Sequence, residues 1–207
     1  MINPLFWWYL TRASGIVAWG LLTASALWGI LLSTRLLKPY DRPAWLLDLH
    51  RWVGTLTIIG VAIHLVAIVA DSYVHFSIAG VLVPMTSTWR PGAVAWGIVA
   101  MYLLVAVQVS SVLMKKIPKR LWRGIHLTSY AMFASVSVHS LTAGTDRGTA
   151  LFQALAVALI TLMIALTSIR LLYRGKPRSR ALLSAKSVAA ASPSISLQQP
   201  LPPPSRN

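Results

Sequence analysis

Long apolar segments alternate with short polar or basic connections along this chain. Five such segments lie near residues 12–33, 46–70, 92–114, 121–141 and 149–173. Each is close to the roughly 20 apolar residues that an α-helix needs to cross the hydrocarbon core of a bilayer. The pattern predicts an all-α fold, a polytopic membrane helix bundle of about five transmembrane helices, that occupies residues 1–173.

The last stretch, residues 174–207, has a different composition. It is first basic and then rich in Ala, Ser and Pro, and it ends in LPPPSRN. Because such a composition cannot bury a hydrophobic core, we expect a disordered C-terminal tail.

Composition agrees with a membrane protein and excludes several kinds of cofactor. Hydrophobic residues make up 56% of the 207 residues and charged residues only 11%, which is far less charge than a soluble domain carries. The absence of cysteine excludes disulfides, iron–sulfur clusters and covalent attachment of haem. The net charge of +15 would suggest nucleic acid for a soluble protein. Here the basic residues cluster at helix ends, so we expect the lipid bilayer as a partner and no nucleic acid.

The basic residues gather on alternate connections. Nearly all Lys and Arg residues lie close to the 34–45 link, close to the 115–120 turn, or beyond residue 169; the exceptions are Arg12, Arg90 and Arg147. The positive-inside rule then places the N-terminus outside and the C-terminus in the cytoplasm of a multi-pass protein of the cell membrane. In this topology the segments at 46–70 and 121–141 run parallel.

Four histidines lie within these two parallel segments. His50 and His64 are fourteen positions apart, which puts both imidazoles within about 40° of one helix face. His126 and His139 are thirteen positions apart, which in an ideal helix turns the second by about 140° from the first. The segment at 121–141 therefore needs a π-bulge, a kink or another irregularity if its two histidines are to serve the same purpose.

Pairing the histidines across the two helices gives two sites stacked across the membrane. His50 would face His126, and His64 would face His139. Two neutral imidazoles on opposite sides of a flat ring are what a six-coordinate b-type haem requires. We therefore expect haem b, two per chain or one if a single pair binds, with these four histidines as axial ligands of the iron.

Haem ligation explains the four histidines better than packing, proton transfer or zinc binding does. A lone intramembrane histidine is more often a hydrogen-bonded packing residue, but two pairs at near-equal spacing are hard to assign to packing. A proton relay would need an acidic partner, and no Asp or Glu lies deep in a segment. A zinc site is weaker still, because the histidines of one helix are too far apart to share an ion.

Basic residues near the histidines are candidates for binding the haem propionates. Arg51 and Arg123 lie close to His50 and His126, although both would also serve as positive-inside charges. Arg12 lies on the side expected to be poor in arginine, so it is a candidate partner for the outer haem. No catalytic acid or base is expected.

Other residues have a packing or solvent explanation beside the functional one. Gly54 and Gly124 would allow close approach of a ring, or of another helix. Trp122 fits an interfacial belt better than an electron path. His75 falls in the outer connection, where a solvated residue is the simpler reading.

The sequences HRWVGTLTIIGVAIH, from His50 to His64, and WRGIHLTSYAMFASVSVH, from Trp122 to His139, resemble the ferric reductase-like transmembrane domain. This family includes the haem-bearing core of ferric reductases and NADPH oxidases and the haem-binding membrane subunit of a methionine sulfoxide reductase system. The resemblance covers roughly residues 10–173, and the family shares both histidine spacings. It implies an inner haem on His50 and His126 and an outer haem on His64 and His139.

The resemblance implies a membrane b-type cytochrome that carries electrons from the cytoplasm to an extracytoplasmic acceptor. Larger relatives continue into a flavin- and NADPH-binding domain, whereas no G-x-G-x-x-G phosphate loop follows a strand here. We therefore expect an oxidoreductase component whose electrons come from a separate flavoprotein or a bound flavin. The alternatives are a quinol-linked haem subunit that serves a dedicated extracytoplasmic reductase, and a non-catalytic membrane scaffold or assembly protein.

Overall fold

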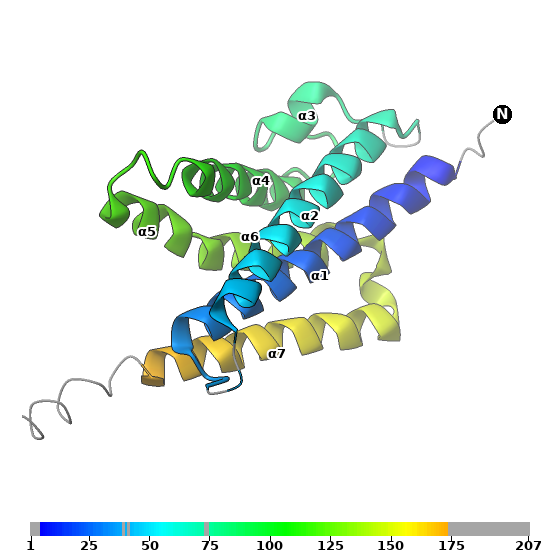
Figure 1. Cartoon of the computed structure of the whole chain (residues 1–207). Coiled ribbons are helices and arrows are strands. Elements are labelled where there is room, and N and C mark those ends of the chain that lie inside the picture. Colours follow the sequence, from blue (N-terminus) through cyan, green and yellow to red (C-terminus); the bar gives the residue numbers. More distant parts are fainter. Residues whose placement is uncertain (1–4, 39, 41, 73–74, 174–207) are drawn as a thin grey trace, which may run out of the picture. The chain divides into compact units, whose positions relative to one another are not determined.

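The computed structural model describes residues 5–38, 40, 42–72 and 75–173 (Figure 1). The chain divides into two compact units, Met1–Ile169 and Arg170–Asn207, and the fold described below is that of the first. The predicted tail, residues 174–207, lies outside the described residues.

Helices account for all the regular structure of the described residues, which contain no strand. The elements in chain order are α1 (Phe6–Thr34), α2 (Pro43–Ala70), α3 (Ile78–Leu82), α4 (Pro91–Val112), α5 (Lys119–Leu127), α6 (Ser129–Ala143), the 3₁₀ helix η1 (Thr145–Gly148) and α7 (Ala150–Tyr173). Four of them, α1, α2, α4 and α7, contain a span long and apolar enough to cross a membrane. The predicted all-helical, polytopic membrane protein is confirmed.

Prolines and one left-handed residue set several helix ends. Pro43 and Pro91 occupy the first turns of α2 and α4, where the missing N–H of proline has no intrahelical partner to lose. Pro118 lies immediately before α5. At the end of α1, Arg35 adopts a left-handed conformation with φ of 53°, and its N–H donates to the carbonyl oxygen of Leu31.

The segment predicted at 121–141 is two helices, α5 and α6, with a break at Thr128. The N–H of Thr128 donates to the carbonyl oxygen of Ile125, three residues earlier, at 3.0 Å. Its hydroxyl donates to the same oxygen at 2.6 Å. A threonine that bonds back to the preceding turn competes with the α-helical ladder and often bends a helix. The irregularity that the histidine spacing requires therefore lies between His126 and His139.

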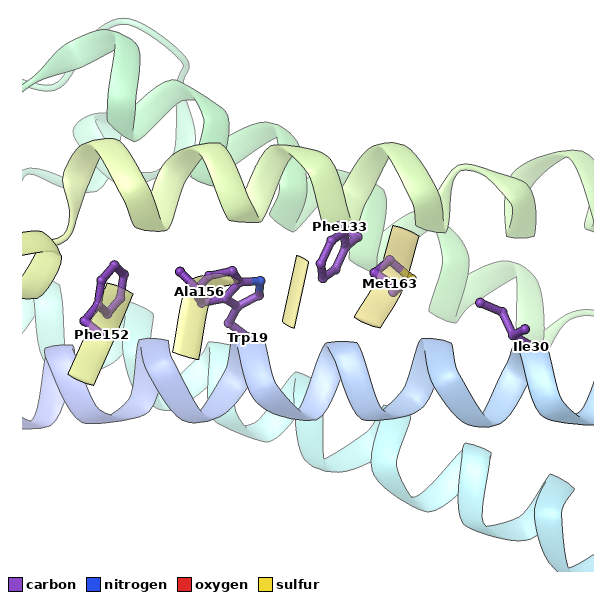
Figure 2. Packing of buried hydrophobic residues seen from close by; sticks show 6 residues of the cluster. All are labelled: Trp19, Ile30, Phe133, Phe152, Ala156 and Met163. Carbon is purple, nitrogen blue, oxygen red and sulfur yellow. The ribbon is translucent and has the colours of Figure 1, made fainter. Parts of the chain in front are cut away.

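The helices pack in two pairs that meet through α1 and α6. In Figure 1, α1 lies beside α2, and α4 lies beside α6. A hydrophobic cluster joins α1, α6 and α7, and Figure 2 shows its side chains between these helices. The buried members of the cluster are Trp19, Ile30, Phe133, Phe152, Ala156 and Met163.

Large apolar side chains also cover the outer surfaces of the helices. Val66 is 63% exposed, Val105 53%, Val157 65% and Ile164 62%. A soluble monomer rarely exposes contiguous apolar surface on this scale, whereas lipid chains solvate it. The exposed faces therefore fit a bilayer environment for the helices.

Candidate functional site

The structure brings the four intramembrane histidines together as two facing pairs. The ring centroids of His50 in α2 and His126 in α5 are 6.0 Å apart, and the ring planes are inclined by 65°. The centroids of His64 in α2 and His139 in α6 are 6.5 Å apart, and their planes are inclined by 84°. Since the pairs occur in the same order along both helices, α2 and the α5–α6 segment run parallel.

The centroid separations match two imidazoles that ligate one metal ion from opposite sides. A metal–nitrogen bond is about 2.0 Å long and the ring centre lies about 1.2 Å behind the nitrogen, so opposed ligands have centroids about 6.4 Å apart. The observed values of 6.0 and 6.5 Å lie on either side of this distance. The spacing of each pair is therefore compatible with one ion between its rings.

Backbone carbonyl groups orient three of the four rings. His64 Nδ1 donates to the carbonyl oxygen of Thr11 at 2.8 Å, and His139 Nδ1 donates to that of Ala93 at 2.9 Å. His50 Nδ1 donates to the carbonyl oxygen of Ser25 at 2.9 Å. Because a carbonyl oxygen only accepts, Nδ1 carries the proton in each ring, and Nε2 retains the lone pair that a metal needs. Metal-ligating histidines are held in this way in most known sites.

His126 has a different neighbour. The Trp122 ring, one helical turn earlier in α5, stacks on it with centroids 5.1 Å apart and planes inclined by 30°. The sequence reading of Trp122 as a belt residue therefore misses a direct contact with a candidate ligand.

A cavity of about 210 Å³ lies beside the His64–His139 pair. Thr57 and Val61, which lie on the histidine face of α2, contribute to its lining. The charged side chains of its lining are Arg12, Asp71 and Asp146. Neither His50 nor His126 contributes to this cavity.

The predicted propionate partners occupy different positions. Arg12 lines the cavity and forms an ion pair with Asp146 of η1. Arg51 is exposed, and its guanidinium lies 3.6 Å from the carboxylate of Asp48. Arg123 is also exposed. The propionate role of all three arginines stays a prediction.

The two predicted glycines and the loop histidine lie apart from the ring contacts. A Cβ atom at Gly54 would contact only the hydroxyl of Ser25, at 3.8 Å, and a Cβ atom at Gly124 would contact nothing within 4 Å. Neither glycine therefore makes room for a histidine ring, and close approach of a haem ring at these glycines stays a prediction. His75 is exposed, with a left-handed φ of 50°.

The donor set fits haem better than a bare metal ion. Among the described residues, no group of three or more His, Cys, Asp or Glu side chains could hold a metal ion. A tetrahedral zinc site needs at least three protein ligands, whereas haem brings four equatorial nitrogens and takes only two axial ligands. Two neutral imidazoles across a gap between helices would supply those two ligands.

Comparison with known proteins gives one result. No curated protein and no solved structure matches the chain significantly. Residues 11–137 match the family described as "Ferric reductase like transmembrane component". The matched region contains His50, His64 and His126 and ends two residues before His139. Because the match covers more than half of the chain, the protein belongs to the ferric reductase-like transmembrane family.

Proposed function

We propose that this protein is a membrane b-type cytochrome that transfers single electrons across the bilayer through two bis-histidine haems. The observation that carries the proposal is the pair of facing imidazoles, repeated at two levels between α2 and the parallel α5–α6 segment. Membership of the ferric reductase-like family supports transmembrane electron transfer as the general function.

His50 and His126 would ligate one haem, and His64 and His139 the other. When bound, each haem supplies an iron that accepts and releases one electron. The protein supplies axial nitrogen ligands whose tautomers are held by helix carbonyl groups. Apolar side chains around His64 and His139 exclude water and keep the local dielectric constant low.

The distribution of charge supports transfer from the cytoplasm to the outside. The basic connections next to His50 and His126 face the cytoplasm under the positive-inside rule. Their positive field would favour an anionic donor, such as a phosphate-bearing flavin or an acidic flavoprotein. Electrons would then leave from the His64–His139 level to an extracytoplasmic acceptor.

The first test is the haem content of the full chain purified in detergent. We expect reduced-minus-oxidised spectra with low-spin b-type bands and two haems per chain. His64→Ala and His139→Ala should each lose one haem and keep the other. His75→Ala is the matched control, because this exposed histidine lies in a loop, and it should retain both haems.

Other outcomes would select a different function. A wild-type chain without haem, from a host that makes haem freely, would overturn the cytochrome proposal and favour a scaffold. With haem present, reconstituted vesicles separate the donors. Reduction by quinol, without reduction by a reduced flavin, would replace the flavin donor with the quinol-linked alternative.

A further inference from the structure

Helix α1 carries no histidine, yet it contacts both histidines of α2. The carbonyl oxygen of Thr11 accepts from His64 Nδ1, and that of Ser25 accepts from His50 Nδ1. Thr11 and Ser25 are fourteen residues apart, as are His50 and His64. The two helices are antiparallel, so one repeat on α1 matches the histidine repeat on α2.

Each accepting carbonyl group lies four residues before a glycine. Gly15 follows Thr11, and Gly29 follows Ser25, at the positions whose N–H groups bond these carbonyl oxygens in an α-helix. A Cβ atom at Gly15 would lie 3.1 Å from both Nδ1 and Cε1 of His64. A Cβ atom at Gly29 would lie 3.4 Å from Cε1 of His50. The missing side chains therefore form notches into which the imidazole edges fit.

Helix α4 repeats the arrangement for His139. The carbonyl oxygen of Ala93 accepts from His139 Nδ1, and Gly97 lies four residues later. A Cβ atom at Gly97 would lie 2.7 Å from Nδ1, 2.8 Å from Cε1 and 3.0 Å from Cγ of His139. This is the closest of the three approaches.

We propose, on the basis of the proposed function, that Gly15 and Gly97 are positioning residues for the axial ligands His64 and His139, whereas the space at Gly29 also admits a methyl group beside His50. Gly15 and Gly97 each let an imidazole edge reach a helix carbonyl oxygen that a side chain would otherwise cover. The resulting hydrogen bond holds the ring orientation, keeps the proton on Nδ1 and makes Nε2 a more basic ligand. Helices α1 and α4 thereby control ligands that belong to α2 and α6.

The distances predict a graded effect of adding one methyl group. Nonbonded contacts of a Cβ atom below 3.0 Å essentially do not occur in proteins, so Gly97→Ala must displace the His139 ring. Gly15→Ala requires a shift of a few tenths of an ångström at His64. Gly29→Ala creates only ordinary van der Waals contact with His50. The effect should therefore decrease in the order Gly97, Gly15, Gly29.

The experiment compares these three variants with two controls on the same helices. A Cβ atom at Gly20 of α1 or Gly92 of α4 would contact nothing within 4 Å. Gly20→Ala and Gly92→Ala thus make the same chemical change away from the rings, including the same gain in helix propensity. For each full-length protein we would measure haem per chain, the low-spin electron paramagnetic resonance signal of each haem, and both midpoint potentials.

We expect two haems with wild-type signals in both controls and in Gly29→Ala. Gly97→Ala should lose the haem of the His64–His139 pair, or bind it without the wild-type low-spin signal. Gly15→Ala should keep this haem with a shifted signal and potential. The haem of the His50–His126 pair should be unchanged in both, and its retention shows that the variant is folded. If Gly97→Ala loses both haems through misfolding, the comparison of Gly15→Ala with Gly20→Ala tests the positioning role instead.

The results separate this inference from the function on which it rests. A wild-type protein with two haems, together with Gly97→Ala and Gly15→Ala variants that match their controls, would overturn the positioning role alone. A wild-type protein without haem would overturn the cytochrome function and this inference with it.

Discussion

Arg12 in α1 and Asp146 in η1, which are 134 positions apart in sequence, form a bidentate ion pair. Arg12 Nε donates to Asp146 Oδ2 at 2.8 Å, and Nη2 donates to Oδ1. Both residues line the cavity beside His64 and His139. The sequence predicts Arg12 as a propionate partner, but its charge is shared with a carboxylate of this chain. Asp146 is thus a second determinant of the electrostatic potential in the cavity.

Neutralising the two partners should move the potential of the neighbouring haem in opposite directions. A positive charge favours the reduced iron, so Arg12→Gln should lower the midpoint potential and Asp146→Asn should raise it. Unit charges about 10 Å apart interact by about 1.7 kcal/mol at an effective dielectric constant of about 20, which is about 70 mV for one electron. Redox titration of the visible bands measures both shifts. The control is Arg147→Gln, an exposed neighbour in η1, and shifts of the same sign in the two variants would contradict this account.

The sequence predicts the helices well because the bilayer restricts them to long apolar segments. The helix expected at 46–70 is observed at Pro43–Ala70. The start of α1 is less accurate, since Phe6 begins the helix six residues before the predicted position. Trp7, Trp8 and Tyr9 are residue types typical of a membrane interface, and they lie in the first turns of α1. Aromatic identity suggests a membrane interface, but it does not say whether the backbone there is already helical.

The histidine pairs follow from sequence, but the groups that orient them do not. A histidine is visible as a residue type, and its period gives the helix face. The acceptors at Thr11, Ser25 and Ala93 are backbone carbonyl oxygens, which every residue has. The sequence signal for these acceptors on α1 is the fourteen-residue spacing of Gly15 and Gly29, which equals the spacing of the two histidines of α2. That signal becomes informative only once α1 is known to pack against α2.

The break at Thr128 can be tested by changing the length of the segment. Insertion of one alanine after Thr128 gives His126 and His139 the fourteen-residue spacing of α2. The break at Thr128 already compensates for the thirteen-residue spacing of His126 and His139. The extra residue should therefore rotate His139 about 100° away from His64. We expect loss of one haem and retention of the haem of the His50–His126 pair. An alanine inserted after Lys116, in the turn before α5, is the control, and an insertion after Thr128 that keeps both haems would contradict this geometry.

Ser25 should affect the midpoint potential of the haem of the His50–His126 pair and not that of the other haem. Its hydroxyl lies 3.3 Å from His50 Nδ1, in addition to the carbonyl contact of the same residue. Removing a hydrogen bond to the ligand lowers the basicity of the imidazole and destabilises ferric iron. Ser25→Ala should therefore raise this potential, by about 20 mV if the bond contributes about 0.5 kcal/mol. Ser33→Ala, on an exposed part of the same helix, should change neither potential. A shift at the His64–His139 pair would refute the assignment.

Trp19 should contribute most to stability among the tryptophans of the described helices, because its side chain is 0% exposed and packs at the junction of α1, α6 and α7. Its ring lies 6.1 Å from that of Phe152, centroid to centroid. Trp19→Ala leaves a cavity in this cluster and should lower the free energy of unfolding by about 3–5 kcal/mol. Trp52 is 68% exposed on α2, so Trp52→Ala should change the free energy of unfolding by less than about 1 kcal/mol. Unfolding of both variants by sodium dodecyl sulfate in mixed micelles provides the comparison. Equal losses would mean that the cluster does not hold α7 against the rest of the bundle.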